Sequence, residues 1–495
     1  MTETNKTAPQ DSDLPIPFGI SARTGTPLEG FTHHSLEQMV VNGGVPAKLD
    51  RTFQNKVQSA EKAFGVVGGT DACDLKKQGW GILYANSVRQ EIKDALRPLL
   101  DWRQTQVKDG PFKVFEGERG GYQPKEDAAS WLDRQGGVSL DIVDPAEDGV
   151  PYYLMIVGSP EEIPFEFQYE LDIFWAVGRL WFETKEEFSR YVESVIDYER
   201  KEAITNSKQI AIFATEHDFD NATQLFTKEV VVPLTAGTAN TSPLGLEQGF
   251  KQLRLLGKAS TENLAATKEN LSELLSGNLS RGTPAVIFSG THGMEFGLND
   301  NRQKDCQGAL VCQDWNGYGS IESKDWFSAA DIPKNAKLSG LIHFLFACHG
   351  AGYPQFDDFD RLNAHPRKIA AEAQLSSLPQ RLLSHPLGGA LAVLGHVERA
   401  WAYSFQSGSG RSQIQGFRDV LGRLLLGDRI GNATDAFNSR WAALSTKLTR
   451  VLGEMQEPSQ NSKNALANLW VSRDDARNYI IFGDPAVRLR VADMV

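Results

Sequence analysis

Two short apolar segments near the middle of the chain constrain its fold more than any other feature. Residues 284–289 lead into His292 and Gly293, and residues 341–347 lead directly into Cys348. Apolar runs of this length are typical of strands that are buried on both faces of a parallel sheet. In such sheets, binding and catalytic sites gather at the carboxyl ends of the strands. We therefore expect His292 and Cys348 to lie at one edge of a sheet.

The residue types at these strand ends predict nucleophilic catalysis by a thiol. An imidazole takes the proton of a neighbouring thiol, and the thiolate then attacks a carbonyl carbon. The backbone N–H groups of Gly293 and Cys348 would hold the oxyanion that forms. Two plainer interpretations stay open: Cys348 as a small buried hydrophobe, and His292 as a loop residue that caps a turn. His343 and His349 are less suitable bases, because one lies within a strand and the other is adjacent to the thiol.

Composition limits the class of protein. The chain has 495 residues, of which 41% are hydrophobic, so it is long enough for two or three domains with a sizeable core. A net charge of −12 argues against a nucleic-acid surface, which needs a basic face. Four cysteines are too few for a disulfide framework. The first residues form no apolar leader and no segment resembles a membrane span, so we expect a cytoplasmic protein without membrane contact.

The sequence contains no motif that predicts a cofactor. Five residues separate Cys306 from Cys312, a wider spacing than the usual zinc knuckle has. His-Glu-x-x-His, the Walker A sequence and Gly-x-Ser-x-Gly do not occur either. We therefore expect neither a metal nor an organic cofactor.

Strand and helix patterns alternate along most of the chain, which predicts an α/β fold with mainly parallel strands and helices on both faces. We divide the chain into a flexible N-terminal arm (1–45), a first α/β subdomain (46–205) and a second (206–495). A polar segment (298–338) would form a surface insertion beside the site. The predicted strands are 81–85, 152–158, 172–178, 209–214, 285–289, 341–347, 389–395 and 479–482. The predicted helices include 185–201, 245–256, 260–276, 416–426 and 434–456.

Acidic residues that follow the predicted nucleophile are candidates for binding a basic substrate side chain. Asp357 and Asp358 come shortly after it, and Glu398 ends the next predicted strand. Trp401 would form a wall of the same pocket. A solvated acidic loop is the plainer interpretation, and Arg399 would instead favour an acidic substrate side chain.

Several stretches resemble one known group of peptidases. Residues 346–350 read Phe-Ala-Cys-His-Gly, similar to the caspase signature Gln-Ala-Cys-x-Gly with phenylalanine in place of glutamine. Cys348 follows His292 by 56 residues (348 − 292), near the caspase interval of about 50. Further stretches similar to gingipain-type peptidases are residues 157–164, 176–180, 388–396 and 482–489. The chain thus resembles bacterial caspase-like cysteine peptidases with a CHAT domain and gingipain-type C25 peptidases.

This resemblance implies a fold and a set of site residues. The fold would be two caspase-like three-layer (αβα) subdomains with mainly parallel sheets, of which the C-terminal one is catalytic. His292 would be the general base and Cys348 the nucleophile, and the amides of Gly293 and Cys348 would form the oxyanion hole. An acidic residue enters the S1 pocket of Arg-specific gingipains, and Glu170 is among the acidic residues at the matching approach here.

We predict a cysteine endopeptidase that forms a thioester acyl-enzyme and cleaves after a basic P1 residue in intracellular regulated proteolysis. Its partners would be protein or peptide substrates, with an activating protein as a further partner. One alternative is a non-catalytic caspase-like scaffold that binds other proteins. Another is a self-processing protease, with cleavage sites at Arg302, Lys304 or Lys324 of the insertion.

Overall fold

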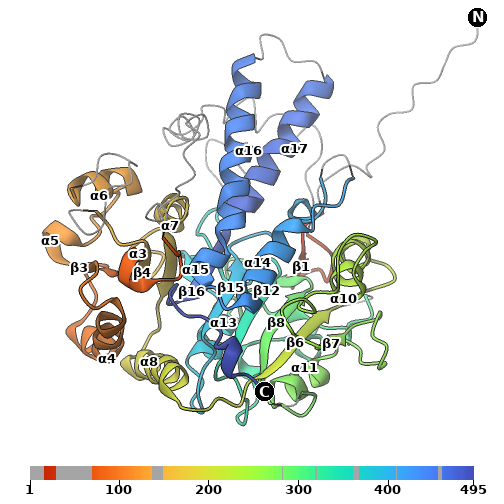
Figure 1. Ribbon diagram of the computed structural model, residues 1–495. Helices are drawn as coiled ribbons and strands as arrows, with labels where there is room; N and C mark the ends of the chain where they lie inside the picture. The colour runs from red at the N-terminus through yellow and green to blue at the C-terminus, as the bar shows by residue number, and fades with distance from the viewer. Residues whose placement is uncertain are drawn as a thin grey trace, which may run out of the picture.

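A ten-stranded sheet forms the centre of the molecule, and helices lie against it (Figure 1). The structure is a computed structural model that describes residues 16–28, 70–136, 149–280, 282–317, 320–359, 367–407, 410–454 and 460–495. From one edge to the other the strands are β3 (Phe112–Phe115), β2 (Trp80–Tyr84), β4 (Tyr153–Val157), β5 (Ala176–Leu180), β16 (Tyr479–Gly483), β15 (Ala392–His396), β12 (Ile342–Phe346), β8 (Pro284–Gly290), β6 (Ser207–Ala214) and β7 (Gln252–Leu256). The predicted α/β class is confirmed.

The central sheet consists of two parallel halves that run in opposite directions. Neighbouring strands are parallel except β15 and β16, which pair antiparallel. The carboxyl ends of β8 and β12 therefore share one edge of the sheet. Although β16 lies near the end of the chain, it pairs with β5, so both predicted subdomains contribute to one sheet. The division near residue 205 falls between α8 (Lys185–Arg200) and β6, and it stays a prediction.

The helices that cover the sheet follow from amphipathic spacing and from capping residues. In α8 the residues at helical spacing, such as Phe188 and Val192, are buried, and Thr184 with Glu187 forms a capping box at its start. The other α-helices within the described ranges are α3 (Leu75–Gln78), α4 (Gln90–Val107), α5 (Gly117–Gly120), α6 (Ala128–Arg134), α7 (Phe165–Asp172), α9 (Asn221–Phe226), α10 (Val232–Ala236), α11 (Lys268–Leu275), α12 (Gln303–Cys306), α13 (Ser377–Leu383), α14 (Gln415–Leu426), α15 (Ile430–Ala433), α16 (Asp435–Glu454) and α17 (Gln460–Arg477).

Some predicted elements differ from the structure. The helix expected over 260–276 begins only at Lys268, and two other elements are wrong. Residues 245–256 were expected to be helical, but they form a turn followed by the edge strand β7. The strand expected at 172–178 begins only at Ala176, because α7 extends to Asp172. In both places the apolar residues fit either period, and packing against the neighbouring strand decides between them.

A buried ion-pair network joins the first helices to the end of the chain. Arg103 on α4 donates to Asp484, just after β16, at 2.7 Å, and to Glu199 on α8 at 2.6 Å. The Arg103 side chain is fully buried, so its charge depends on these two carboxylates. Trp80 Nε1 donates to the same Asp484 carboxylate at 3.1 Å.

A second, smaller sheet lies beside the carboxyl ends of β8 and β12. Its order is β1 (Gly19–Ser21), β9 (Gly293–Glu295), β10 (Leu310–Val311) and β11 (Trp326–Phe327). The segment predicted as a surface insertion supplies β10 and β11, and it encloses a small apolar core of its own. Residues 16–28 belong to the arm that was predicted to be flexible, yet Gly19–Ser21 pair with β9 and Pro17 forms a bridge with Trp401. The remainder of that arm, 1–15 and 29–45, lies outside the described residues.

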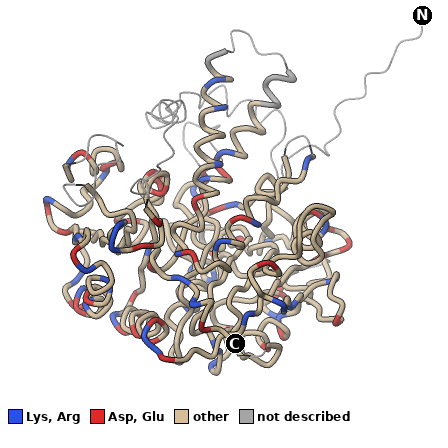
Figure 2. Tube along the Cα trace, viewed as in Figure 1, with Lys and Arg blue, Asp and Glu red and all other residues tan. Residues whose placement is uncertain are grey.

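A hairpin of α16 and α17 projects from the body of the molecule (Figure 1). Apolar residues of both helices, such as Leu448 and Trp470, form a separate apolar cluster with Trp401 and Tyr403. Lys and Arg residues are interspersed with Asp and Glu along the visible trace (Figure 2). Within the described ranges, no helix is both long enough and apolar enough to cross a membrane.

Candidate active site

The structure brings His292 and Cys348 to adjacent loops at one edge of the central sheet. β8 and β12 are parallel neighbours whose last residues, Gly290 and Phe346, are paired, and each loop begins there. A Cβ atom placed on Gly293 would overlap the Cys348 carbonyl and lie 3.0 Å from the Cys348 nitrogen. Only glycine therefore allows the two loops to approach so closely.

The imidazole of His292 is held by a carboxylate that sequence reasoning missed. His292 Nε2 lies 2.8 Å from Asp220 Oδ2, and both side chains are buried. Asp220 is itself fixed as the N-cap of α9, where it accepts from the amides of Ala222 and Thr223. No local motif marks Asp220, which lies 72 residues from His292 in sequence. Its one signal is that Asp-Asn-Ala-Thr begins a helix after a buried strand.

The Asp220 carboxylate fixes the tautomer of His292. Burial alone would raise the pKa of this carboxyl, but the neighbouring imidazole and the donors of Thr223 hold the pKa well below its usual range. An ionised carboxylate only accepts hydrogen bonds, so Nε2 of a neutral His292 carries the proton. Nδ1 is then the basic nitrogen, and it has no hydrogen-bond partner among the described residues.

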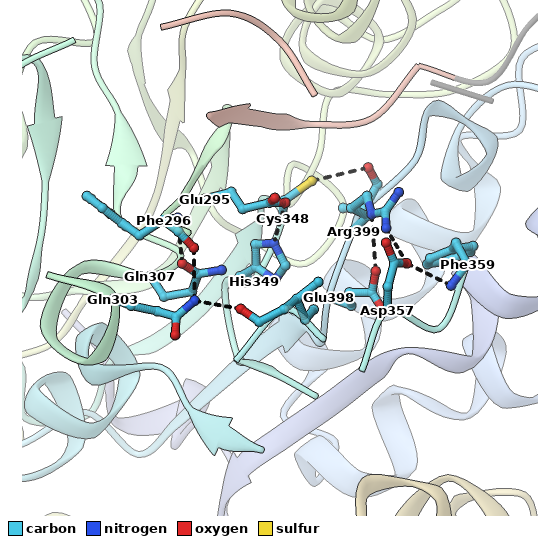
Figure 3. A network of polar contacts seen from close by, with 12 residues as sticks. Glu295, Phe296, Gln303, Gln307, Cys348, His349, Asp357, Phe359, Glu398 and Arg399 are labelled. Atoms are coloured by element: carbon cyan, nitrogen blue, oxygen red, sulfur yellow. Dashed lines mark hydrogen bonds and ion pairs between the residues drawn. The ribbon is translucent and has the colours of Figure 1, made fainter. Parts of the chain in front are cut away.

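The thiol of Cys348 is fully buried, and burial raises its pKa above the ordinary value. Its Sγ atom lies 3.8 Å from the carbonyl oxygen of Ala400 (Figure 3). A thiol without solvent contact is a poor nucleophile until a base takes its proton. The strand β1, drawn in pale red in Figure 3, passes close to the sulfur, since a Cβ atom placed on Gly19 would lie 3.0 Å from Sγ.

Two backbone amides beside the thiol converge on one carbonyl oxygen. The N–H groups of Gly293 and of Cys348 both donate to the oxygen of Phe18, each at 2.9 Å. These are the two amides that the sequence predicted as the oxyanion hole. Two donors at this distance from one oxygen match the geometry that stabilises an oxyanion.

The acidic residues predicted for the S1 pocket form a network with arginines (Figure 3). Asp357 binds Arg399 and, at 2.8 Å, Arg367. Glu398 accepts from Arg399 at 3.1 Å and from the amide of Asp358 at 2.9 Å. Burial and the charge of Asp357 raise the pKa of Glu398. These carboxylates are thus already paired with cations of the protein.

The other predicted pocket residues lie in different surroundings. The backbone of Trp401 forms a bridge with Pro17, whereas its ring packs on Phe359 with centroids 5.3 Å apart. Glu170 on α7 accepts from the amide of Ala128 at 2.9 Å, and burial raises its pKa to about 7. The structure therefore does not bring Glu170 together with His292 or Cys348 through any described contact.

The two alternative histidines make other contacts. His343 Nε2 lies 2.7 Å from Ser289 Oγ between the strands, and burial lowers its pKa to about 3. His349 Nε2 lies 3.3 Å from Glu295. His349 and Glu398 both adopt a left-handed backbone, with φ of 58° and 62°, which non-glycine residues seldom do outside constrained sites. Among the described residues, no three side chains of His, Cys, Asp or Glu form a group that would hold a metal ion.

One family model and several solved structures are similar to this chain. The model of peptidase family C25 matches residues 139–490, well over half of the chain. A crystal structure of the Arg-specific cysteine proteinase gingipain R is 12% identical in sequence and has a TM-score of 0.42. The matched region covers 84% of this chain and 79% of the gingipain R chain. A chain in the complex of Porphyromonas gingivalis RgpB pro- and mature domains is 12% identical and has a TM-score of 0.41, with 83% of this chain and 80% of that chain covered. A chain in the Saccharomyces cerevisiae separase–securin complex is 11% identical and has a TM-score of 0.30, with 91% of this chain and 23% of that chain covered. No curated protein sequence matches the chain.

Proposed function

This chain belongs to peptidase family C25 and is a cysteine-type peptidase, and we propose that His292 is its general base and Cys348 its nucleophile. One observation carries the proposal. The amides of Gly293 and Cys348 point at the same oxygen directly beside the thiol, which is where a peptide carbonyl must sit for attack. A peptidase also needs a base at this point, and Nδ1 of His292 is the nitrogen left unprotonated by Asp220.

The proposed mechanism has two halves. In the first, His292 takes the thiol proton, and the sulfur of Cys348 adds to the carbonyl carbon of the scissile bond. The two amides hold the oxyanion, and the imidazolium donates its proton to the departing amine. In the second half, His292 deprotonates a water molecule, which hydrolyses the thioester and restores the thiol.

Asp220 acts in this mechanism as a positioning residue. It touches no reacting atom, but its carboxylate faces the imidazole and stabilises the positive charge that His292 gains. Because helix α9 fixes Asp220 through two amide donors, the imidazole cannot rotate freely. The arrangement supports a cysteine–histidine pair oriented by a third, acidic group.

The finer predictions of substrate and location stay predictions. The name of the Arg-specific gingipain R structure is the one finding that favours the predicted basic P1 residue. Asp357 and Glu398 do not support a basic P1 residue, because both carboxylates are already paired with Arg399. We also propose a cytoplasmic location, an activating protein partner and a role in regulated proteolysis.

The experiment that tests the function compares single substitutions in the purified full-length chain. We expect Cys348→Ala and His292→Ala to abolish peptide hydrolysis, whereas the matched variants Cys306→Ala and His385→Ala keep it. Iodoacetamide at neutral pH should label Cys348 faster than the other cysteines when strand β1 no longer lies against its thiol. Peptide hydrolysis by Cys348→Ala would refute the assignment, and a chain that neither hydrolyses peptides nor labels at Cys348 would be the predicted scaffold.

A further inference from the structure

The first described segment of the chain lies in the cleft as a substrate would. We propose that residues 16–21 occupy the substrate groove with Phe18 in the S1 pocket, and that the enzyme cleaves its own Phe18–Gly19 peptide bond. This inference rests on the proposed function and names the substrate class of the same site, peptides with an aromatic P1 residue.

The backbone of the segment pairs with both sides of the cleft. On the unprimed side, the amide of Phe18 donates to the oxygen of Ala400 at 2.9 Å, and the amide of Ala402 donates to the oxygen of Ile16 at 3.1 Å. The segment thus adds an antiparallel strand to residues 400–402. This main-chain pairing is the way extended peptides are held by a sheet edge, independent of side chains.

On the primed side the segment pairs with β9. Gly19, Ile20 and Ser21 run parallel to β9, from Gly293 to Glu295. The chain then turns back, and the amide of Leu28 donates to the oxygen of Gly19 at 2.9 Å. Contacts on both sides of one peptide bond define which bond lies at the catalytic centre.

That bond is Phe18–Gly19. Its carbonyl oxygen receives both oxyanion-hole amides, and a Cβ placed on Gly19 would lie only 3.0 Å from Cys348 Sγ. Glycine at this position therefore lets the backbone pass directly beside the thiol. The same residue brings the carbonyl carbon of Phe18 next to the nucleophile.

The side chain of Phe18 fills an aromatic pocket. It is fully buried, and its ring lies 4.9 Å from Phe346, 5.7 Å from Phe405 and 5.8 Å from Phe226, centroid to centroid. His292 lies 5.7 Å away and forms the side toward the catalytic centre. All three phenylalanines meet the ring edge-on, the geometry that aromatic pairs prefer.

The pocket selects against the basic side chain that the acidic residues were predicted to bind. A buried guanidinium or ammonium group needs a carboxylate partner, and the rings around Phe18 offer none. The carboxylates of Asp357 and Glu398 are bound to arginines instead. The walls therefore fit an aromatic P1 residue, and they distinguish this pocket from one for arginine or lysine.

The proposed step balances as an ordinary acyl transfer. The sulfur of Cys348 bonds to the carbonyl carbon of Phe18, the C–N bond to Gly19 breaks, and the proton taken by His292 passes to the new amino group. Water then hydrolyses the thioester, so residues 1–18 leave with a terminal carboxylate and the remaining chain begins at Gly19. Cleavage vacates the aromatic pocket and the groove along residues 400–402, while Gly19–Ser21 stay paired with β9.

The test follows the full-length chain by intact mass and N-terminal sequencing during incubation at neutral pH with a thiol reductant. We expect a product that begins at Gly19, formed at a rate independent of protein concentration, and no such product from Cys348→Ala. Phe18→Ala should slow it at least tenfold, whereas Phe18→Tyr and the matched surface variant Phe356→Ala should not. The incubated enzyme should hydrolyse an Ile-Pro-Phe amide at least tenfold faster than an Ile-Pro-Arg amide.

The outcomes separate this inference from the proposed function. Cleavage after Arg23, Arg302 or Lys304 overturns the inference and supports basic P1 preference. An uncut chain that still hydrolyses added peptides through Cys348 overturns the inference and leaves the function standing. If the wild-type chain and the Phe18→Ala variant cleave neither themselves nor any added peptide, the proposed function is refuted. The peptide pair decides the P1 residue even where Phe18→Ala does not fold.

Discussion

Replacing Asp220 by asparagine isolates the contribution of one charge to the catalytic centre. The carboxylate lies 2.8 Å from His292 Nε2 and also caps α9. Asparagine is as good an N-cap as aspartate, so Asp220→Asn removes the charge and keeps the cap. One orientation of the new amide also places an N–H against Nε2, which moves the imidazole proton to Nδ1, the nitrogen that must be free to act as the base.

The magnitude follows from the geometry. Unit charges about 4 Å apart interact by about 4 kcal/mol at an effective dielectric constant of 20. The imidazolium forms only as the thiol is deprotonated, so this stabilisation is absent from the ground state and present in the transition state. At about 1.4 kcal/mol for each factor of ten, Asp220→Asn should lower kcat roughly 10³-fold and change KM little.

The assay is steady-state hydrolysis of one fluorogenic peptide by wild type, Asp220→Asn and Asp220→Ala. Thermal unfolding of the same samples is the control. Asp220→Asn should unfold close to the wild-type midpoint, whereas Asp220→Ala lacks the helix cap and should be about 1 kcal/mol less stable. If Asp220→Asn keeps kcat within threefold of wild type at an unchanged midpoint, the carboxylate does not orient the base, and the argument for Nδ1 fails.

Three further substitutions test other parts of the structure. Arg103→Met should destabilise the fold by about 3–5 kcal/mol in urea, because two buried carboxylates, Asp484 and Glu199, lose their cation; a loss below about 1 kcal/mol would contradict this. Burial raises the pKa of Glu170 from 4.5 to about 7, so the folded state holds a proton that the unfolded state releases, and stability falls as pH rises between these values. Glu170→Gln should therefore stabilise by about 2–3 kcal/mol at pH 8 and much less at pH 5, and equal effects at both pH values would refute the assignment. Gly293→Ala should lower peptide turnover at least 10²-fold, since its methyl group overlaps the Cys348 carbonyl and displaces an oxyanion donor; turnover near wild type would show that this amide is dispensable.

The buried strands were predictable because their surroundings are uniform. Both segments that lead to His292 and Cys348 are mostly apolar, and strands that are buried on both faces of a sheet need this composition. Their polar members Ser289 and His343 contact each other between the strands. The α8 helix was equally clear, since a capping box and helical spacing coincide. Where the apolar pattern fitted either period, as at 245–256, the edge position of β7 decided the outcome and the sequence alone did not.

Phe18 and Asp220 were missed because each acts through a contact distant in sequence. Residues 16–28 have the proline and glycine of a loop, and composition predicted a flexible arm. A signal was present in the alternation of Ile16, Phe18 and Ile20, which is the period of a strand. That alternation does not show which sheet edge the strand joins. The amides of Gly293 and Cys348 that bind the Phe18 oxygen come together only in the folded chain.

The burial of Cys348 is consistent with a catalytic thiol because the covering segment is part of the chain. Without Phe18, the amides of Gly293 and Cys348 would lack their shared acceptor, and an aromatic pocket would be open to water. The segment therefore stabilises the folded cleft while it excludes other peptides, and its tether gives it an effective concentration on the order of millimolar. An added substrate must exceed that competition as long as the chain is intact. Cleavage after Phe18 removes the tether. The released peptide then competes for the groove only at its actual concentration in solution, and it dissociates on dilution. A single bond placed at the catalytic centre thus determines both the latency of the enzyme and its release.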